Sequence, residues 1–294
     1  MPNQITSLKT INNEKLIIKK LASLNSISDI KLNDTGWDSR VYSFGDGQYF
    51  FKFPRSKKVQ NLYKYEIAAI KHLKKLDTEV FIQKIIWEHP DNDYFGYLGM
   101  VGHPLTDVIN KLSKKQSKSV AASIGIFLKQ LHGSSLAGAR IKTISSELDQ
   151  IKRWYTDNLS VIYDVFNKKQ QELLNDLVCI KWPARVNELG SDLVLSHGDL
   201  GLHNIVCDKD LNMSVIDFGD VAYYDRSKDF IELQKNNIFF STILRAYGID
   251  SQLLLSKIAV RQQMIQIISL GYFAGKNDKV NLQKTINIIK DYLV

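Results

Sequence analysis

One stretch constrains the fold more than any other: residues 193 to 220, LVLSHGDLGLHNIVCDKDLNMSVIDFGD. Two short apolar runs in it each end in a polar cluster. The first cluster contains Asp199, with Asn204 five positions later, and the second begins at Asp217. Either cluster alone would fit the polar turn of a hairpin. Their combination predicts two strand ends that bring an acid, an amide and a second acid to one place.

These three side chains suit phosphoryl transfer from a nucleotide. The carboxylate of Asp199 can accept a proton from an attacking hydroxyl. The amide of Asn204 and the carboxylate of Asp217 can bind Mg²⁺, which prefers a small number of oxygen ligands from protein. The stretch therefore predicts a magnesium-dependent site for a nucleotide.

The length and composition fit an ordinary globular chain. Its 294 residues can form one large domain or two lobes. Residues 1–15 lack the apolar core of a signal peptide, and no apolar run approaches the ~18 residues that span a membrane. Cys179 and Cys207 lie in apolar surroundings without metal-binding spacing, which predicts buried free thiols in a reducing compartment. These features predict a cytoplasmic protein with no membrane partner.

The net charge of +8 attracts phosphate groups, on a nucleic acid or on a nucleotide. The lysines are spread along predicted helices, and no nucleic-acid-binding motif accompanies them. This pattern favours a solvated basic surface over a nucleic-acid site. We expect a monomer whose partner is a small molecule.

The hydrophobic pattern predicts an α+β fold with two lobes. Residues 1–98 form a small N-terminal lobe, 99–103 a glycine-rich hinge, and 104–294 a larger, mainly helical C-terminal lobe. A helix over 12–28 precedes five antiparallel strands at 30–32, 41–44, 49–53, 80–87 and 94–101, with a helix over 59–76 between the third and fourth. A capping box at Ser113 opens the next helix, which ends near 131. Further helices are predicted at 145–158, 160–166, 168–180, 228–246, 251–273 and 279–293.

Lys52 and Glu66 form a predicted pair in the N-terminal lobe. Lys52 lies within an aromatic strand, and Glu66 lies on the apolar face of the following helix. A buried carboxylate needs a cationic partner, which Lys52 can supply. The alternative is that Glu66 reaches solvent at the margin of the apolar face.

Two further segments are candidates for nucleotide contacts. The small, polar loop 34–39, which ends at Ser39, is a weak candidate for a phosphate-binding loop because it lacks the G-x-G-x-x-G pattern. Backbone groups of the hinge around Leu98 and Met100 could pair with a purine edge. ATP is the default donor, but the bulk of Tyr97 before the hinge could crowd adenine and favour GTP.

In these residues the chain resembles the aminoglycoside phosphotransferase and choline-kinase family, small-molecule kinases with a protein-kinase-like fold. The resemblance covers roughly residues 30 to 245 and extends to FFKFPR at 50–55, GYLGMVGHPLT at 96–106 and FLKQLH at 127–132. It is strongest to bacterial antibiotic phosphotransferases of the aminoglycoside 2''-type, because choline kinases tend to have Glu where this chain has Gly219.

The resemblance implies a role for each matching residue. Asp199 is the catalytic base, Asn204 and Asp217 bind Mg²⁺, and Lys52, held by Glu66, binds the α- and β-phosphates. His197 and Asp229 are implied as structural braces. Asp220 and Glu232 are candidate substrate contacts, with a loop-capping role open for Asp220. His203 has no motif role, so a packing or surface position is expected.

Two departures distinguish the chain from protein kinases. Gly198 stands where protein kinases have an arginine, and only nine residues separate Gly219 from Asp229, which leaves no room for a peptide-binding activation segment. A non-catalytic nucleotide sensor is the other class, and the presence of all five implied catalytic, metal and phosphate residues disfavours it.

The acceptor is the least constrained part of the prediction. An antibiotic is favoured, an aminoglycoside before a macrolide, and a hydroxylated metabolite such as choline or a sugar-like compound is the alternative. Residues 221–294 contain six acids and ten lysines or arginines, whereas a site for a polycation would prefer acids. A local acidic patch of Asp199, Asp220, Glu232 and either Glu147 or Asp149 would resolve this conflict.

Overall fold

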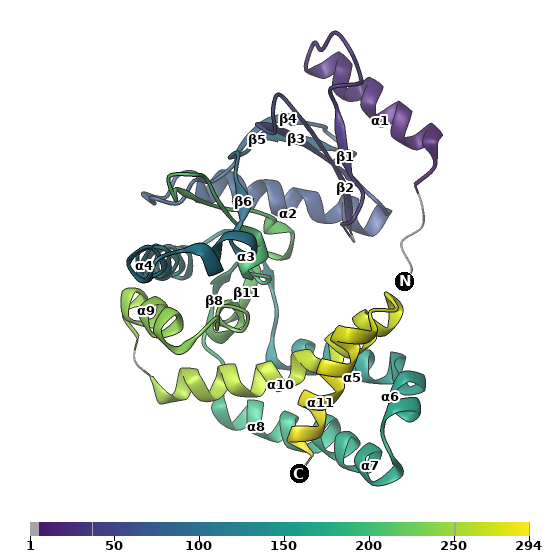
Figure 1. Ribbon diagram of the computed structural model, residues 1–294, viewed down its shortest axis with the longest axis vertical. Coiled ribbons are helices and arrows are strands. Elements are labelled where there is room, and N and C mark those ends of the chain that lie inside the picture. The colour runs from purple at the N-terminus through teal and green to yellow at the C-terminus, as the bar shows by residue number, and fades with distance from the viewer. Residues whose placement is uncertain (1–5, 37, 250, 294) are drawn as a thin grey trace.

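The N-terminal lobe contains the predicted five-stranded antiparallel sheet. The computed structural model describes residues 6–36, 38–249 and 251–293, and within them the strand order is β1-β2-β3-β5-β4. The strands are β1 (Lys31–Asn33), β2 (Ser39–Phe44), β3 (Tyr49–Pro54), β4 (Lys84–Glu88) and β5 (Phe95–Leu98). Figure 1 shows this sheet above a larger helical lobe, so the predicted α+β fold is confirmed.

The two faces of the sheet pack against different helices. Side chains alternate across a strand, so Phe51 and Phe53 point to one face while Lys52 points to the other. The aromatic face packs beside α1 (Leu8–Leu21), and α2 (Lys57–Leu73) lies across the opposite face (Figure 1). Helix α1 is fixed by buried Glu14, which accepts hydrogen bonds from Arg40 and from the Tyr42 hydroxyl.

Several predicted boundaries in this lobe were wrong. Helix α1 begins earlier than predicted, where the Ser7 side chain caps Thr10, and ends at Leu21 instead of near 28. The strand predicted over 80–87 begins only at Lys84. The preceding segment crosses to the other lobe, where the Phe81 amide donates to the Met213 carbonyl at 2.7 Å.

The chain passes through 99–102 into the C-terminal lobe, which adds helices and two small three-stranded sheets. The first sheet joins β6 (His103–Pro104), β9 (Ile205–Cys207) and β10 (Met213–Val215), and the second joins β7 (Arg140–Ile141), β8 (Leu193–Ser196) and β11 (Ala222–Asp225). The helices are α3 (Leu105–Val108), α4 (Lys114–His132), α5 (Ile144–Asp157), α6 (Leu159–Val165), α7 (Lys168–Asp176), α8 (Trp182–Leu189), α9 (Asn237–Tyr247), α10 (Gln252–Gly275) and α11 (Lys279–Tyr292).

The predicted capping box at Ser113 is confirmed, but two helix predictions in this lobe were wrong. The helix expected over 228–246 begins only at Asn237, because residues Arg226–Phe230 form a 3₁₀ turn that directs Asp229 inward. The helix expected over 168–180 ends at Asp176, and a π-helical turn leads into α8, which the sequence did not reveal.

The cysteines differ in exposure. Cys207 is buried as predicted, but Cys179 is exposed, because the π-helical turn Leu177–Lys181 directs Val178 into the core instead. Both thiols are free. Among the described residues, the longest apolar helices fall short of what a membrane span requires.

Candidate active site

The ends of β8 and β10 bring the predicted acids and amide together. The loop after β8 carries Asp199, and the Asn204 side-chain amide donates to the Asp199 carbonyl at 2.8 Å and to its carboxylate at 3.1 Å. The amide of Ile216 donates to the Asn204 carbonyl at 3.0 Å, which fixes Asp217 beside Asn204. Asp217 has a φ of +65°, so the chain bends sharply as soon as β10 ends.

Lys52 connects the two lobes. Its Nζ lies 2.7 Å from Glu66 Oε1 and 3.0 Å from Asp217 Oδ1. The predicted ion pair with Glu66 is present, and the alternative in which Glu66 reaches solvent is wrong because only 3% of that residue is exposed. Burial alone would lower the pKa of Lys52, but the carboxylates of Asp217 and Glu66 raise it well above its ordinary value. The lysine is therefore a cation at neutral pH.

Asp217 and Asn204 have the donor chemistry for Mg²⁺. The ammonium of Lys52 lowers the pKa of Asp217, which keeps that side chain ionised. Its side chain is 55% exposed, so it can reach a ligand from solvent. The Asn204 side-chain nitrogen donates a hydrogen bond to Asp199, which leaves the side-chain oxygen available to bind a metal ion. A carboxylate and an amide oxygen fit a Mg²⁺ site with few protein ligands.

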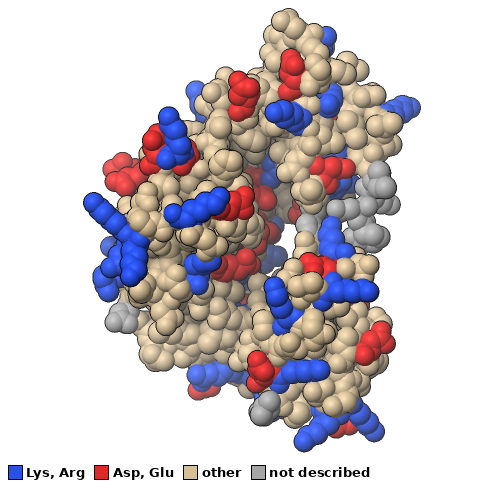
Figure 2. Space-filling view, viewed as in Figure 1, with Lys and Arg blue, Asp and Glu red and all other residues tan. Residues whose placement is uncertain are grey.

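Two further carboxylates, those of Asp220 and Glu232, lie near Asp199. His203, which the sequence placed outside the site, lies between two acids: Nε2 is 3.9 Å from Asp199 Oδ2, and Nδ1 is 3.8 Å from Glu232 Oε2. Burial and the nearby Asp199 carboxylate raise the pKa values of both Glu232 and Asp220. Figure 2 shows acidic side chains along the left wall of the central hollow, while lysines and arginines border it on the lower right and are spread over the outer surface.

Asp229 holds the loop that carries Asp199. Its carboxylate accepts hydrogen bonds of 2.8 Å from the backbone amides of His197 and Gly198, and His132 Nε2 lies 3.0 Å away. Burial raises the pKa of Asp229, but these hydrogen bonds outweigh it and lower the pKa below the ordinary value. His197 Nε2 lies 2.9 Å from the Ile216 carbonyl, which ties this loop to the segment before Asp217.

Gly198 is required by its surroundings. Its φ is +86°, and a Cβ atom there would lie 2.7 Å from the Asp220 carbonyl oxygen. A larger residue would therefore push the segment 217–220 away from Asp199. This close approach explains why no arginine stands at this position.

The predicted nucleotide loop is held by contacts that the sequence did not reveal. Ser39 is buried, and its hydroxyl lies 2.7 Å from the Tyr63 hydroxyl, so this side chain fixes the loop to α2. Arg55 donates to the backbone carbonyls of Gly36 and Asp34. Trp37, within the predicted loop, lies outside the described residues. A phosphate contact of Ser39 stays a prediction.

The hinge lies at the end of the sheet. Leu98 pairs with Tyr49 and with Lys84, and the Gly99 amide donates to the Gln48 carbonyl at 2.8 Å. Met100 follows outside the ladder and is partly buried. Contacts of Leu98 and Met100 with a purine stay a prediction.

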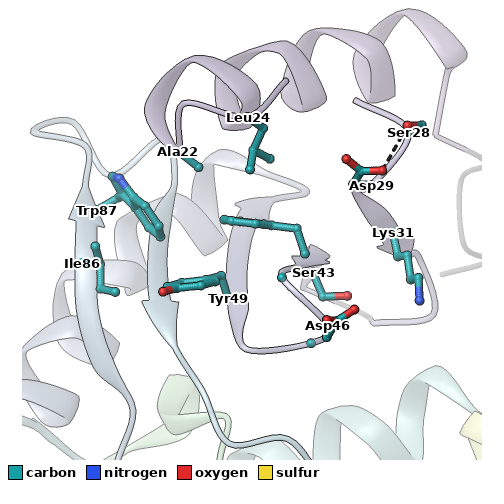
Figure 3. A pocket seen from close by; sticks show the side chains of 13 residues that line it. Ala22, Leu24, Ser28, Asp29, Lys31, Ser43, Asp46, Tyr49, Ile86 and Trp87 are labelled. Carbon is teal, nitrogen blue, oxygen red and sulfur yellow. Dashed lines mark hydrogen bonds between the residues drawn. The ribbon is translucent and has the colours of Figure 1, made fainter. Parts of the chain in front are cut away.

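A cavity of about 830 Å³ lies on the other face of the same sheet. Leu24, Tyr49, Ile86 and Trp87 line it, and Asp29 and Asp46 lie at its polar side (Figure 3). It contains none of the residues that converge on Lys52 and Asp199, so it lies apart from the candidate active site.

The comparisons with known proteins agree with this geometry. A model of the phosphotransferase enzyme family matches residues 29–254. Among curated proteins, none matches the chain. Solved structures of similar fold include aminoglycoside 2'-phosphotransferase-IIIa with GDP (TM-score 0.76, 16% identity, covering 96% of this chain and 98% of that one). Another is aminoglycoside phosphotransferase APH(2'')-Ib with ADP (TM-score 0.70, 18% identity, 94% and 96%).

A third similar structure is macrolide 2'-phosphotransferase type I, with a TM-score of 0.67 and 18% identity over 97% of this chain and 99% of that one. At such identities the structural similarity establishes the fold. It leaves the acceptor to be argued from the site itself.

We predict that Asp229→Asn destabilises the protein by about 3–5 kcal/mol at neutral pH, because it leaves buried donors without their charged acceptor. The lowered pKa means that wild-type Asp229 contributes stability above the ordinary Asp pKa of about 4, and that this stability is lost as pH falls through the lower folded value. Urea unfolding should therefore show the two proteins converging as the solution becomes more acidic. Asp210→Asn, at an exposed turn, is the control, and a constant gap across acidic pH would contradict the prediction.

Proposed function

The chain belongs to the phosphotransferase enzyme family, and we propose that it is a small-molecule kinase that transfers the γ-phosphate of ATP or GTP to a hydroxyl of an antibiotic. The observation that carries this proposal is the convergence of Lys52, Asp217 and Asp199 from two lobes on one exposed site. An aminoglycoside is the first candidate acceptor and a macrolide the second.

The site residues divide the chemistry between them. Lys52 would bind the α- and β-phosphates, because its charge is fixed by Glu66 and faces Asp217. Asn204 and Asp217 would hold Mg²⁺, which when bound neutralises charge on the phosphates. Asp199 would accept the proton of the acceptor hydroxyl, and Asn204 keeps that carboxylate oriented. Positioning and charge stabilisation supply most of the catalysis in such reactions.

The placement of acids supports a cationic acceptor. The basic balance of residues 221–294 argued against one, but Asp199 and Glu232 lie together beside His203, and Asp220 lies close enough for Asp199 to raise its pKa. Glu147 is instead engaged by Arg261 at 2.8 Å, so it is not a free member of this patch. A cluster of partly exposed carboxylates next to the base can bind the ammonium groups of an aminoglycoside.

Other functions explain less of the site. A kinase of choline or of a sugar-like metabolite needs the same phosphoryl-transfer residues and is the alternative. A pseudokinase has no use for an oriented Asp199. We propose that the protein acts as a monomer in the cytoplasm, where the exposed thiol of Cys179 would stay reduced.

We predict that Asp199→Ala lowers the turnover number by about 10²–10⁴, the usual range for a positioned general base, while nucleotide affinity is kept. Asp217→Ala should in addition weaken Mg²⁺-nucleotide binding. Steady-state kinetics and calorimetry with ATP and GTP measure both effects, and Asp210→Ala is the exposed control. Near-normal turnover of Asp199→Ala would show that the base is another residue.

The donor prediction depends on Tyr97. Its ring stacks on Phe50, with centroids 5.3 Å apart and planes 14° apart, and neighbouring Phe95 on the same strand face lies 5.8 Å from Lys52 Nζ. The Tyr97 ring therefore lies on the sheet face that carries Lys52. We predict a higher kcat/KM with GTP than with ATP, and a shift toward ATP in Tyr97→Ala. Equal or better turnover with ATP in the wild type would contradict this prediction.

The acceptor prediction is tested by resistance. Expression in a susceptible bacterium should raise the inhibitory concentration of an aminoglycoside more than that of a macrolide. In the purified protein, Glu232→Gln should raise KM for the aminoglycoside roughly tenfold, the scale of one charged hydrogen bond, with little change in kcat. Glu172→Gln, on an exposed position of α7, is the control. No change in resistance to any tested drug would exclude the hypothesis that the acceptor is an antibiotic, and it would favour a metabolite kinase.

A further inference from the structure

Arg140 contacts the segment that follows Asp217, although it lies far from that segment in sequence. It stands on β7, which pairs in parallel with β11, so that Arg140 is opposite Ala222. One terminal nitrogen of its guanidinium donates to the carbonyls of Gly219 at 2.7 Å and of Val221 at 3.1 Å. These two carbonyls flank Asp220, so one side chain fixes the path of the backbone just beyond the proposed metal ligand.

The same guanidinium also contacts the N-terminal lobe. Its central carbon lies 5.5 Å from the centre of the Tyr65 ring, within the range of a cation–π interaction. Tyr65 is on α2 and directly precedes Glu66, the partner of Lys52. Arg140 therefore touches both halves of the site: the segment after Asp217 and the helix that holds Lys52.

The charge of Arg140 is not used in an ordinary ion pair. Across the residues that the structure describes, no carboxylate lies within ion-pair distance of it, and its Nε is buried without a hydrogen-bond partner. Its positive charge acts instead on the nearby acids and lowers the pKa of Asp220, against the larger effects of burial and of the other carboxylates. Arg140 thus offsets part of the repulsion among the acids of the site.

We propose that Arg140 is a positioning residue for phosphoryl transfer. Its hydrogen bonds hold residues 219–221 so that Asp217 stays aimed at the Mg²⁺-nucleotide, and its contact with Tyr65 keeps that segment in register with the Lys52–Glu66 pair. Gly198 allows the backbone of Asp220 to approach the Asp199 loop, and Arg140 binds the carbonyls on either side of Asp220 in the same segment. This role rests on the proposed use of Asp217 as a metal ligand.

The test is the dependence of nucleotide binding on Mg²⁺, which a merely structural residue would not change. Calorimetry with ATP and with GTP, each with and without Mg²⁺, gives the factor by which the metal strengthens binding. Arg140→Lys keeps a positive charge but lacks the planar guanidinium that donates to both carbonyls and faces the Tyr65 ring. We expect it to reduce that factor roughly tenfold, the scale of a lost charge-assisted hydrogen bond, and to leave metal-free binding unchanged. Arg185→Lys, on an exposed arginine of α8, should match the wild type.

A second variant keeps the test decisive if Arg140→Lys is unstable. Tyr65→Leu leaves Arg140 and its carbonyl contacts in place and removes only the ring. We expect it to reduce the Mg²⁺ factor, as Arg140→Lys does. Thermal unfolding should show that this variant is folded. If wild-type binding shows no Mg²⁺ dependence, the proposed function fails, and this inference with it. If wild-type binding depends on Mg²⁺ and both variants keep the wild-type factor, the role of Arg140 alone is overturned.

Discussion

The burial of the Lys52 ammonium is the constraint on which the site depends. A buried cation is costly unless carboxylates surround it, and Lys52 obtains one from α2 and one from the other lobe. The strand that carries Lys52, the helix that carries Glu66 and the segment that carries Asp217 must therefore adopt one arrangement together. The same contacts leave Asp217 ionised and partly exposed, so the requirement for charge balance also leaves this carboxylate available for the proposed Mg²⁺.

A second group of contacts, at the ends of β8 and β10 in the C-terminal lobe, fixes the loops that carry Asp199 and Asp217. Asp229 binds the loop before Asp199, and His197 bonds to the segment before Asp217. Arg140 donates a hydrogen bond to the segment after Asp217. Each brace acts on backbone amides or carbonyls, so the loop positions are set by the main chain, and none of these braces occupies the carboxylates of Asp199 and Asp217. This division explains why Asp199 and Asp217 can be exposed and still well positioned.

The sequence predicted what is encoded locally. The position of Glu66 on an apolar helix face predicted its pairing with Lys52, and the spacing of Asp199, Asn204 and Asp217 predicted that all three lie in one site. What it missed depends on contacts between distant segments. The Phe81 amide donates its hydrogen bond to Met213 in the other lobe, so the strand predicted over 80–87 begins only at Lys84. Arg140 belongs to no recognisable motif. Its two hydrogen-bond partners lie 79 and 81 residues away in the sequence.

The charge of the chain illustrates the same limit at larger scale. A net charge summed over residues 221–294 argued against a cationic acceptor, yet such a sum ignores where each side chain points. Lys257 and Arg261 are buried and pair with Asp225, so their charges are largely balanced inside the protein and are not presented to a ligand at the surface. The acids beside Asp199 are partly exposed, and partial burial together with the Asp199 carboxylate raises the pKa values of Asp220 and Glu232, which makes a neighbouring cation favourable. His203 already occupies the space between two of these acids, and a cationic acceptor has to share or displace it. For the proposed cationic acceptor, selectivity would therefore depend on a competition between the ligand's ammonium groups and this imidazole, a property of the folded site that no sum over the sequence contains.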